Sequence, residues 1–420
     1  MPRSQLEALQ NELLVRQVGY VYEKAPVFRE LCQETGVRPS DIRSAADLPK
    51  LPVLEKRHLR EFRDRHGDPF GGAACVPTSQ LLMANHSTGT SGKPTLFGLT
   101  RRDYETIGDV YARVLYSIGF RSGYCWGANG ILRWHGYQVA AEYGAQKIGV
   151  VPFLMARPPR GDTLPGLFED WGDCDFNVLG HYQPEFEIPY LRSRPFKPLE
   201  IFPNLRFITT GVDLSDARRR IIEEAWGVPF RNTYGSGDQY LAGGECELDQ
   251  PYFHMPEDRY LLELLDPDTR EPVPPGQPGE LHVTNLWAEA FPFIRYRMED
   301  IAVAKYETCA CGRTAMRLRI LGRLAWSVDV GGRRVFNSEV EDVLWSHPEL
   351  EVVPYQLVRR TRQPQDLLQV RLAKNDGRPE LAEEAARLLE RRLGVPAQVD
   401  FLEEGSIKHG LKMQRLAVVD

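Results

Sequence analysis

From residue 100 to about residue 300, short apolar runs alternate with longer amphipathic segments. Thr100 precedes the helical pattern RRDYETIGDVYARVLYSIG, and a second helical pattern, YQVAAEYGAQKIG, leads into the apolar run VVPFL. The runs FNVLG, LRFITTG and RNTYG follow, and the helical segment SDARRRIIEEAWG, closed by Gly227, separates the last two. This alternation predicts an α/β sheet with crossover helices, in which ligands bind beyond the carboxyl ends of the strands.

The pattern changes at both ends of this region. Residues 1 to about 75 are expected to be helical, with a break at LPKLPVLEK. Past Leu321 a helix beginning at Asn337 or Ser338 precedes a hairpin of VPYQLVRRT and LLQVRLA, then a helix and the strand AQVDFLE. We therefore expect an α/β fold with a large N-terminal domain of mixed sheets and flanking helices over residues 1–321. A small α+β domain is expected over residues 322–420.

Composition narrows the class of protein. The 420 residues carry a formal net charge of −6, and the basic residues are scattered, which disfavours nucleic-acid binding. No apolar run is long enough to span a membrane, and the amphipathic N-terminus lacks the apolar core of a signal peptide. Seven cysteines spread over the chain do not form a disulfide framework. We expect a cytoplasmic protein with reduced thiols and no membrane or nucleic-acid partner.

The stretch HSTGTSGKPT, residues 86–95, is the most small, polar and flexible part of the chain. Backbone N–H groups, hydroxyl groups and the ammonium of Lys93 suit a polyphosphate, whereas the alternative is a surface linker. It is not a mononucleotide P-loop, because Ser87 stands where the first glycine is needed and Pro94 follows Lys93. Nor is Ser91 a nucleophile elbow, because the second glycine comes one residue too early.

STGTSGKPT instead closely resembles the phosphate loop of the adenylate-forming enzymes, most of all the phenylacetate–CoA ligase branch. Five further stretches resemble that family in its own order: ITTGVD, NTYGSGD, RYRMED, LGRLAWSVDVGGRRVFNSEVEDVL and GLKMQR. The resemblance covers essentially the whole chain. It implies that a carboxylic acid and ATP form an acyl-adenylate and pyrophosphate, and that a thiol, typically that of CoA, then displaces AMP. It also implies that the small C-terminal domain is mobile.

The resemblance assigns the nucleotide contacts residue by residue. The phosphate loop would hold the β- and γ-phosphates of ATP through residues Ser87, Thr88, Gly89, Thr90, Ser91, Gly92 and Lys93. The adenine would lie against Gly211, Val212, Asp213, Tyr234 and Gly235. Asp300 would accept both ribose hydroxyls, and Arg323 would contact the ribose or the phosphates.

Two further residues would act on the reacting groups. Asp238 is the candidate Mg²⁺ ligand, directly or through water, and its alternative is an ordinary acid in a turn. Lys412 would bridge the carboxylate and the α-phosphate and neutralise the charge that develops there.

The acyl pocket is expected near residues 132–144, with Trp134, His135, Tyr137 and Gly235 on its wall. Their bulk and partial polarity favour a flat aryl acid over a fatty chain, although core packing is an equal use for Trp134.

A second site is implied by four residues that some members of this branch carry. Two cysteines in CACGR and two ligands in ECELDQPYFH would satisfy tetrahedral zinc: Cys246, His254, Cys309 and Cys311. Without the resemblance they are four unrelated residues, since Cys-x-Cys is tighter than the usual spacing of zinc ligands.

The chain also departs from the family pattern. Ala325 replaces the hinge aspartate, Gly237 and Asp238 replace Ser or Thr and Glu, and Leu411 replaces a glycine. Three hypotheses follow: an aryl-acid–CoA ligase, an adenylating enzyme that passes its acyl group to a carrier-protein thiol or an amine, and a homologue that binds nucleotide without turnover. Gly331 and Gly332, which CoA must pass, are retained. The assembly stays open, with a homodimer as one alternative.

Overall fold

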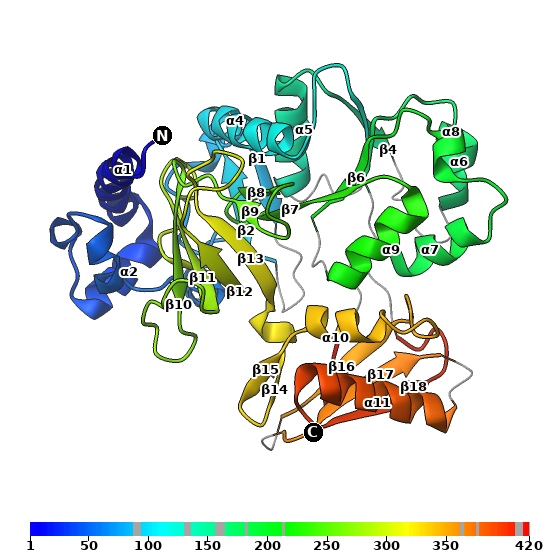
Figure 1. Cartoon of the computed structure of the whole chain (residues 1–420). Helices are drawn as coiled ribbons and strands as arrows, with labels where there is room; N and C mark the ends of the chain where they lie inside the picture. The colour runs from blue at the N-terminus through cyan, green and yellow to red at the C-terminus, as the bar shows by residue number, and fades with distance from the viewer. Residues whose placement is uncertain are drawn as a thin grey trace.

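The computed structural model describes residues 1–86, 94–129, 136–155, 164–180, 184–211, 215–361, 365–374, 378–407 and 415–419. The N-terminal helices lie at one side of a large sheet, and the C-terminal part lies below the sheet, joined to it after strand β13 (Figure 1). None of the described helices is both long enough and apolar enough to cross a lipid bilayer.

The N-terminal region is helical, as the sequence predicts. It contains α1 (Arg3–Lys24), α2 (Pro26–Thr35) and α3 (Lys56–His66), with short 3-10 turns between the last two. Buried apolar residues of these segments, among them Leu14, Val18 and Phe28, pack against Leu286 and Ile294 of the sheet region. The break before α3 has a structural use, because the segment around residue 54 lies beside the start of β12 through backbone hydrogen bonds.

The central sheet has eleven strands among the described residues, in the order β10-β11-β12-β13-β9-β8-β7-β6-β5-β3-β4. One half is parallel and consists of β3 (Cys125–Asn129), β4 (Val151–Met155), β5 (Val178–Gly180), β6 (Phe207–Thr210) and β7 (Phe230–Ser236). β4, β5, β6 and β7 coincide with the predicted apolar runs, whereas β3 was not predicted from the sequence. The parallel half confirms the α/β prediction, since crossover helices connect its strands.

The other half is antiparallel. It consists of β8 (Leu241–Glu245), β9 (Phe253–His254), β10 (Tyr260–Leu265), β11 (Gly279–Asn285), β12 (Tyr296–Lys305) and β13 (Arg317–Arg323). β7 is the junction, because it runs parallel to β6 and antiparallel to β8. Side chains at the end of β7 therefore lie where the two halves meet. A separate antiparallel pair, β1 (Met83–His86) and β2 (Leu96–Leu99), flanks residues 87–95.

Helices cover the sheet, and α4, α5 and α9 lie where the sequence predicts them. They are α4 (Arg101–Ser117), α5 (Gly136–Lys147), α6 (Leu164–Trp171), α7 (Pro184–Arg192), α8 (Pro198–Ile201) and α9 (Asp216–Trp226). The Thr100 hydroxyl accepts a hydrogen bond from the backbone N–H of Asp103, which fixes the start of α4. Ser215 caps α9 in the same way, and Gly227 ends it with φ of 71°.

The C-terminal part forms a small α+β unit. Its four-stranded sheet has the order β18-β17-β16-β19, from β16 (Tyr355–Arg360), β17 (Leu368–Ala373), β18 (Ala397–Leu402) and β19 (Leu416–Val419). It also contains the pair β14 (Val328–Val330) and β15 (Arg333–Val335) and the helices α10 (Asn337–Leu344) and α11 (Pro379–Leu393). The predicted hairpin is β16–β17. The fold class is thus confirmed.

Candidate active site

Asp300 lies where the antiparallel half of the sheet meets the C-terminal part. It pairs with Arg323 across β12 and β13, and Arg323 Nε lies 3.2 Å from Asp300 Oδ1. The hydroxyl of Tyr234, on β7, donates to Asp300 Oδ2 at 2.6 Å. The side chain of Asp300 is buried, so an arginine and a phenol fix the orientation of its carboxylate. The structure brings together three residues that the sequence analysis assigned to one nucleotide.

A second group surrounds Tyr137 of α5. Its hydroxyl donates to Thr233 Oγ1, and Thr233 Oγ1 in turn donates to the Thr210 carbonyl at 3.2 Å. A Cβ on Gly235 would lie 2.6 Å from Tyr137 Cε2 and 2.3 Å from a backbone oxygen, so a side chain does not fit there. A Cβ on Gly211 would lie 3.6 Å from the Tyr137 hydroxyl. Tyr137 and the two glycines, predicted as acyl- and adenine-site residues, are therefore neighbours.

Burial raises the pKa of Tyr137 to about 12. Its hydroxyl consequently stays protonated near neutral pH and acts as a hydrogen-bond donor. A neutral aromatic side chain beside two glycines offers a flat surface rather than a charge. Such a surface suits a planar ligand.

Asp238 is held by two neighbours. The Tyr296 hydroxyl donates to Asp238 Oδ2 at 2.9 Å, and Lys56 Nζ lies 3.3 Å from the same oxygen. Asp238 is buried, and Lys56 stands in the first turn of α3. The backbone of Leu54 exchanges hydrogen bonds with Arg295 and Arg297, which holds the segment before α3 beside this carboxylate.

Sequence reasoning missed Lys56. The only signal was the break at LPKLPVLEK, which showed that the helical region is interrupted but not what the interruption contacts. No spacing rule connects residue 56 with residue 238, because their proximity depends on tertiary packing. The pair adds a cation beside the candidate Mg²⁺ ligand.

The segment assigned to phosphate binding is anchored at both ends. β1 and β2 pair through His86 and Leu96, so residues 87–95 connect two hydrogen-bonded strands. The Tyr240 hydroxyl donates to Asn85 Oδ1 at 2.9 Å, which fastens the end of β1 to the turn that follows β7. The turn contains Asp238. The predicted phosphate loop therefore begins near the predicted Mg²⁺ ligand.

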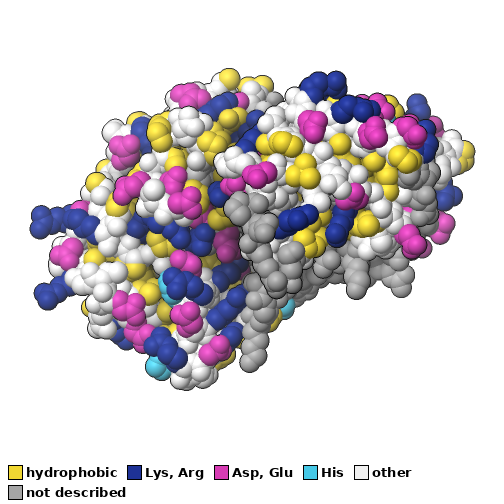
Figure 2. Space-filling model, turned by 90° about the horizontal axis from the view of Figure 1, so that it is seen from below, with side chains coloured by type: hydrophobic (Ala, Val, Ile, Leu, Met, Phe, Trp, Pro, Cys, Tyr) yellow, Lys and Arg dark blue, Asp and Glu magenta, His cyan; other side chains and the backbone are white. Residues whose placement is uncertain are grey.

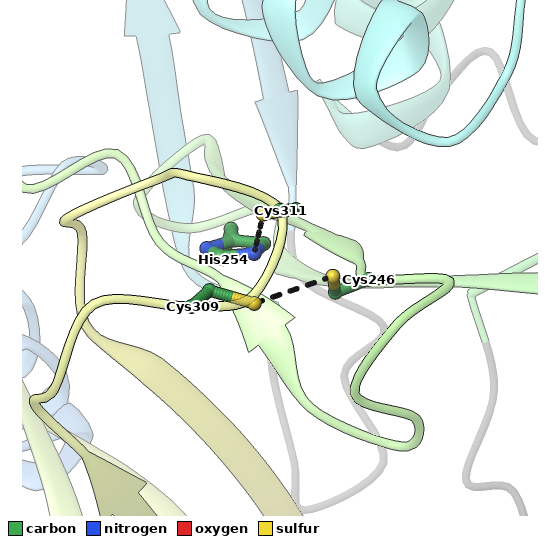
Figure 3. A group of neighbouring side chains, drawn as sticks. All are labelled: Cys246, His254, Cys309 and Cys311. Carbon is green, nitrogen blue, oxygen red and sulfur yellow. Dashed lines mark hydrogen bonds between the residues drawn. The ribbon is translucent and has the colours of Figure 1, made fainter.

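The four predicted zinc ligands lie together (Figure 3). The ligand atoms of Cys246, His254, Cys309 and Cys311 all lie within 4.8 Å of one another. Cys246 Sγ is 3.6 Å from Cys309 Sγ, and Cys311 Sγ is 3.3 Å from His254 Nε2. Sulfur atoms that share one tetrahedral zinc at about 2.3 Å are roughly 3.8 Å apart, so the spacing fits a single ion.

The protonation state of His254 also fits a metal site. Burial, together with Arg313 and Arg317, lowers the pKa of His254 to about 4. The imidazole is therefore neutral near pH 7 and has a lone pair for a metal. Cys246 follows β8, His254 ends β9, and both cysteines of the other pair follow β12. The fold thus brings together two pairs of ligands that are more than 50 residues apart in the sequence.

A cavity of about 500 Å³ lies in the C-terminal part. Its lining includes the two retained glycines, Gly331 and Gly332, and the cationic side chains of Arg334, Arg359 and Arg360. The lining also includes the acids Asp329 and Asp366, so the three arginines leave the cavity with only a small excess of positive charge, which favours an anionic occupant.

Several predicted site residues lie outside the described residues. They are the phosphate-loop residues Ser87, Thr88, Gly89, Thr90, Ser91, Gly92 and Lys93, the pocket residues Trp134 and His135, the adenine-site residues Val212 and Asp213, and Lys412. Their assignments stay predictions.

The chain is similar to several phenylacetate–coenzyme A ligases. It is 36% identical over 375 residues to a phenylacetate–coenzyme A ligase of Thermus thermophilus, covering 86% of this chain and 79% of that protein. It is 30% identical to a phenylacetate–coenzyme A ligase of Aromatoleum evansii, with 100% of this chain and 95% of that protein aligned. A third relative of the same name, from Escherichia coli K12, is 26% identical over 96% of this chain and 92% of its own length. No family model matches the chain.

Solved structures share the fold. A 2-hydroxyisobutyryl-CoA ligase in the postadenylation state, with its acyl-adenylate, superimposes with a TM-score of 0.86 at 23% identity, covering 100% of this chain and 90% of that one. The same ligase with CoA in the thioesterification state gives a TM-score of 0.69 at 24% identity, with the same coverage. An anthranilate CoA ligase gives 0.62 at 16% identity over 81% of this chain and 67% of that one.

Proposed function

The chain belongs to the phenylacetate–CoA ligase family of adenylate-forming enzymes, and on this premise we propose that its substrate is an aryl acid. Enzymes of this family activate a carboxylic acid with ATP and transfer the acyl group to CoA. The observation that carries the nucleotide part of the proposal is the contact of Tyr234 and Arg323 with the carboxylate of Asp300. Both carboxylate oxygens are oriented at a seam between the two parts of the chain, where two sugar hydroxyls can donate to them.

The choice of an aryl acid rests on the group around Tyr137. The Tyr137 ring lies against Gly235, its hydroxyl lies near the Cβ position of Gly211, and none of these three residues carries a charge, so they would suit a planar, uncharged ring. The relatives from three bacteria are named for phenylacetate, which has a planar ring. Trp134 and His135 would complete the wall of the pocket.

Activation brings two anions together, so the proposed machinery supplies positive charge. Asp238 would hold Mg²⁺ next to the phosphate loop, and Mg²⁺ would neutralise charge on the phosphates. Lys56 would balance Asp238 when no metal is bound, because it contacts the same oxygen. Lys93 would bind the leaving pyrophosphate, and Lys412 would neutralise the α-phosphate and the attacking carboxylate.

The second half-reaction would require the domain after residue 321 to rotate. The arrangement of the two parts is closer to the postadenylation structure of the hydroxyisobutyryl ligase than to its thioesterification structure, as the two TM-scores indicate. CoA is favoured over a carrier-protein thiol or an amine, because the arginine-lined cavity beside Gly331 and Gly332 suits the phosphates of a nucleotide. Ala325 at the hinge is compatible with rotation.

We also propose one structural zinc ion held by Cys246, His254, Cys309 and Cys311. Four protein ligands leave no open coordination position, so this metal would stabilise the turn after β12 and take no part in the chemistry. None of the seven cysteines, all of them among the described residues, forms a disulfide. This cysteine usage supports a cytoplasmic location.

Substrate class is tested by ATP–pyrophosphate exchange with a panel of aryl and aliphatic acids at equal concentration. Phenylacetate and related aryl acids should support exchange at least tenfold faster than short aliphatic acids. Faster exchange with 2-hydroxyisobutyrate or a fatty acid would overturn the aryl assignment but not the adenylation.

A further inference from the structure

The two parts of the chain meet at a buried ion pair between α9 and α10, which lie next to each other in Figure 1. Arg218 of α9 donates twice to Glu341 of α10: Nε lies 2.7 Å from Oε1 and Nη2 lies 2.5 Å from Oε2. Arg218 is 7% exposed and Glu341 is 3% exposed. The guanidinium also lies over the ring of Trp345, 4.9 Å from its centroid. A bidentate pair of this kind fixes both distance and orientation.

A second set of hydrogen bonds holds the same two helices. The Ser215 hydroxyl, which accepts from the backbone N–H of Arg218, donates to Glu341 Oε1 at 2.7 Å. The backbone N–H of Ala217 donates to Asp342 Oδ1 at 2.7 Å. Adjacent acids of α10 thus bind the positive N-terminal end of α9.

The Glu341 carboxylate has further partners in the C-terminal part. Arg415 Nη2 lies 3.3 Å from Glu341 Oε2, and the Tyr355 hydroxyl lies 3.3 Å from the same oxygen. The Arg415 guanidinium lies over the Tyr355 ring, 4.4 Å from its centroid. Arg415 precedes β19, and its carbonyl accepts from the backbone N–H of Leu357. One carboxylate therefore joins an arginine of the large domain to an arginine at the base of the last strand.

We propose that Glu341 and Arg218 form a latch that holds the C-terminal domain in the arrangement required for adenylation and releases it for thioester formation. Both would be positioning residues, because neither is among the residues assigned to the nucleotide or the acid. The inference rests on the proposed two-step function. Through Arg415, which stands three residues after Lys412 in the sequence, the latch also orients the start of β19 at Leu416.

The chemistry of the latch suits a reversible contact. A buried ion pair gains Coulomb energy but loses hydration, so the two effects nearly cancel when the pair forms or separates as a whole. Removal of one partner is different, because it leaves the other charge buried. The latch consequently specifies one docked geometry without making undocking prohibitive. Apolar residues of α9 and the small domain also pack in one cluster, which supports docking but sets its orientation less sharply.

The test variant is Arg218→Met, which keeps an unbranched apolar side chain in place of the arginine stem and leaves Glu341 paired with Arg415. Carboxylate-dependent ATP–pyrophosphate exchange should fall at least tenfold, whereas conversion of supplied acyl-adenylate and CoA to thioester should stay within twofold of wild type or rise. Arg218→Lys, which retains the charge but not the bidentate geometry, should show a smaller loss of exchange. Unchanged exchange in Arg218→Met, or a parallel loss of both half-reactions, would overturn the latch.

Arg220→Gln is the matched control. Arg220 lies on the same helix and also reaches the small domain, 3.4 Å from Glu351, but it is largely exposed. Exposed ion pairs contribute little to stability, so this variant should retain ATP–pyrophosphate exchange within twofold of wild type. An equal effect of Arg220→Gln and Arg218→Met would overturn the specific role of Arg218.

Amide hydrogen exchange tests the latch independently of enzyme activity. The Ala217 amide should exchange at least tenfold faster in Arg218→Met than in wild type, while the Asp103 amide, capped by Thr100 within the large domain, should not change. An unchanged Ala217 amide would overturn the latch even if the enzyme is active. Absence of pyrophosphate exchange with every acid in wild type would instead overturn the proposed function.

Discussion

Arg323 contacts Asp300 through its guanidinium, with Nε 3.2 Å from Oδ1, and lies over the ring of Trp326, 5.3 Å from its centroid. The residue that ends β13 therefore links the proposed ribose carboxylate directly to the segment where the hinge is expected. The proposed nucleotide binding at Asp300 and the orientation of the C-terminal domain would share this arginine.

Asp300→Ala should weaken ATP binding at least tenfold. Two hydrogen bonds to a charged acceptor would be lost, each contributing about 1.5–3 kcal/mol. Isothermal titration calorimetry with ATP measures the effect, and Asp329→Ala, which changes an exposed acid of the small domain, is the control. Equal ATP affinity in Asp300→Ala and wild type would remove Asp300 from the nucleotide site.

Gly235→Ala should lower acid activation strongly. The new Cβ would lie 2.3 Å from the Leu241 carbonyl oxygen and 2.6 Å from Tyr137, so β7 or the ring must shift. Overpacking of this kind costs about 1–3 kcal/mol. Exchange with the best aryl acid should fall about tenfold or more, mainly through a higher KM for the acid.

Gly19→Ala is the control for this substitution, because no atom other than those of the neighbouring residues and backbone of α1 itself lies within 4 Å of the Cβ position. It should leave the KM for the acid unchanged. An unaltered KM in Gly235→Ala as well would place the acid elsewhere.

Protein purified without chelators should contain about one zinc per chain. Cys309→Ser should abolish it and lower the unfolding temperature by roughly 5 °C or more, the scale of a loss of a few kcal/mol. Cys174→Ser, which changes a cysteine outside the cluster, should retain the metal. Wild-type protein without zinc, or a Cys309→Ser variant as stable as wild type, would contradict the assignment.

Docking of the C-terminal domain should weaken as pH rises through about 6. Burial raises the pKa of Asp342 to about 6, and the neighbouring acids Asp216 and Glu341 act in the same direction. A carboxyl whose pKa is raised in the folded state stabilises that state below its unfolded pKa, and the stabilisation disappears as the carboxyl ionises. Asp342→Asn keeps an acceptor for the Ala217 amide but cannot ionise. Its unfolding temperature should therefore depend less on pH between about 4 and 6 than that of wild type, and parallel curves would contradict this account.

Local features were predictable from the sequence because their causes are local. α9 begins after Ser215 and ends at Gly227, since a hydroxyl cap and a left-handed glycine act within a few residues. α10 begins at Asn337, one of the two expected starts, and the Glu339 carboxylate accepts a hydrogen bond from the backbone N–H of Phe336 just before the helix.

Long-range relationships were not predictable in the same way. The two-residue strand β9 lies between β8 and β13, and this insertion places His254 beside Cys311. The resemblance, and not the spacing of the cysteines, named those ligands. Contacts such as Lys56 with Asp238 and Arg218 with Glu341 depend on how separate elements pack, so no periodicity or motif revealed them.

The central claim is that the protein makes an acyl-adenylate and transfers its acyl group to CoA. The most direct measurement is mass spectrometry of single-turnover reactions with ATP, Mg²⁺ and phenylacetate, quenched before and after CoA is added. The account predicts phenylacetyl-adenylate and pyrophosphate before CoA, then phenylacetyl-CoA and AMP in equal amounts. Formation of ADP and phosphate, or an adenylate that persists unchanged after CoA is added, would contradict it.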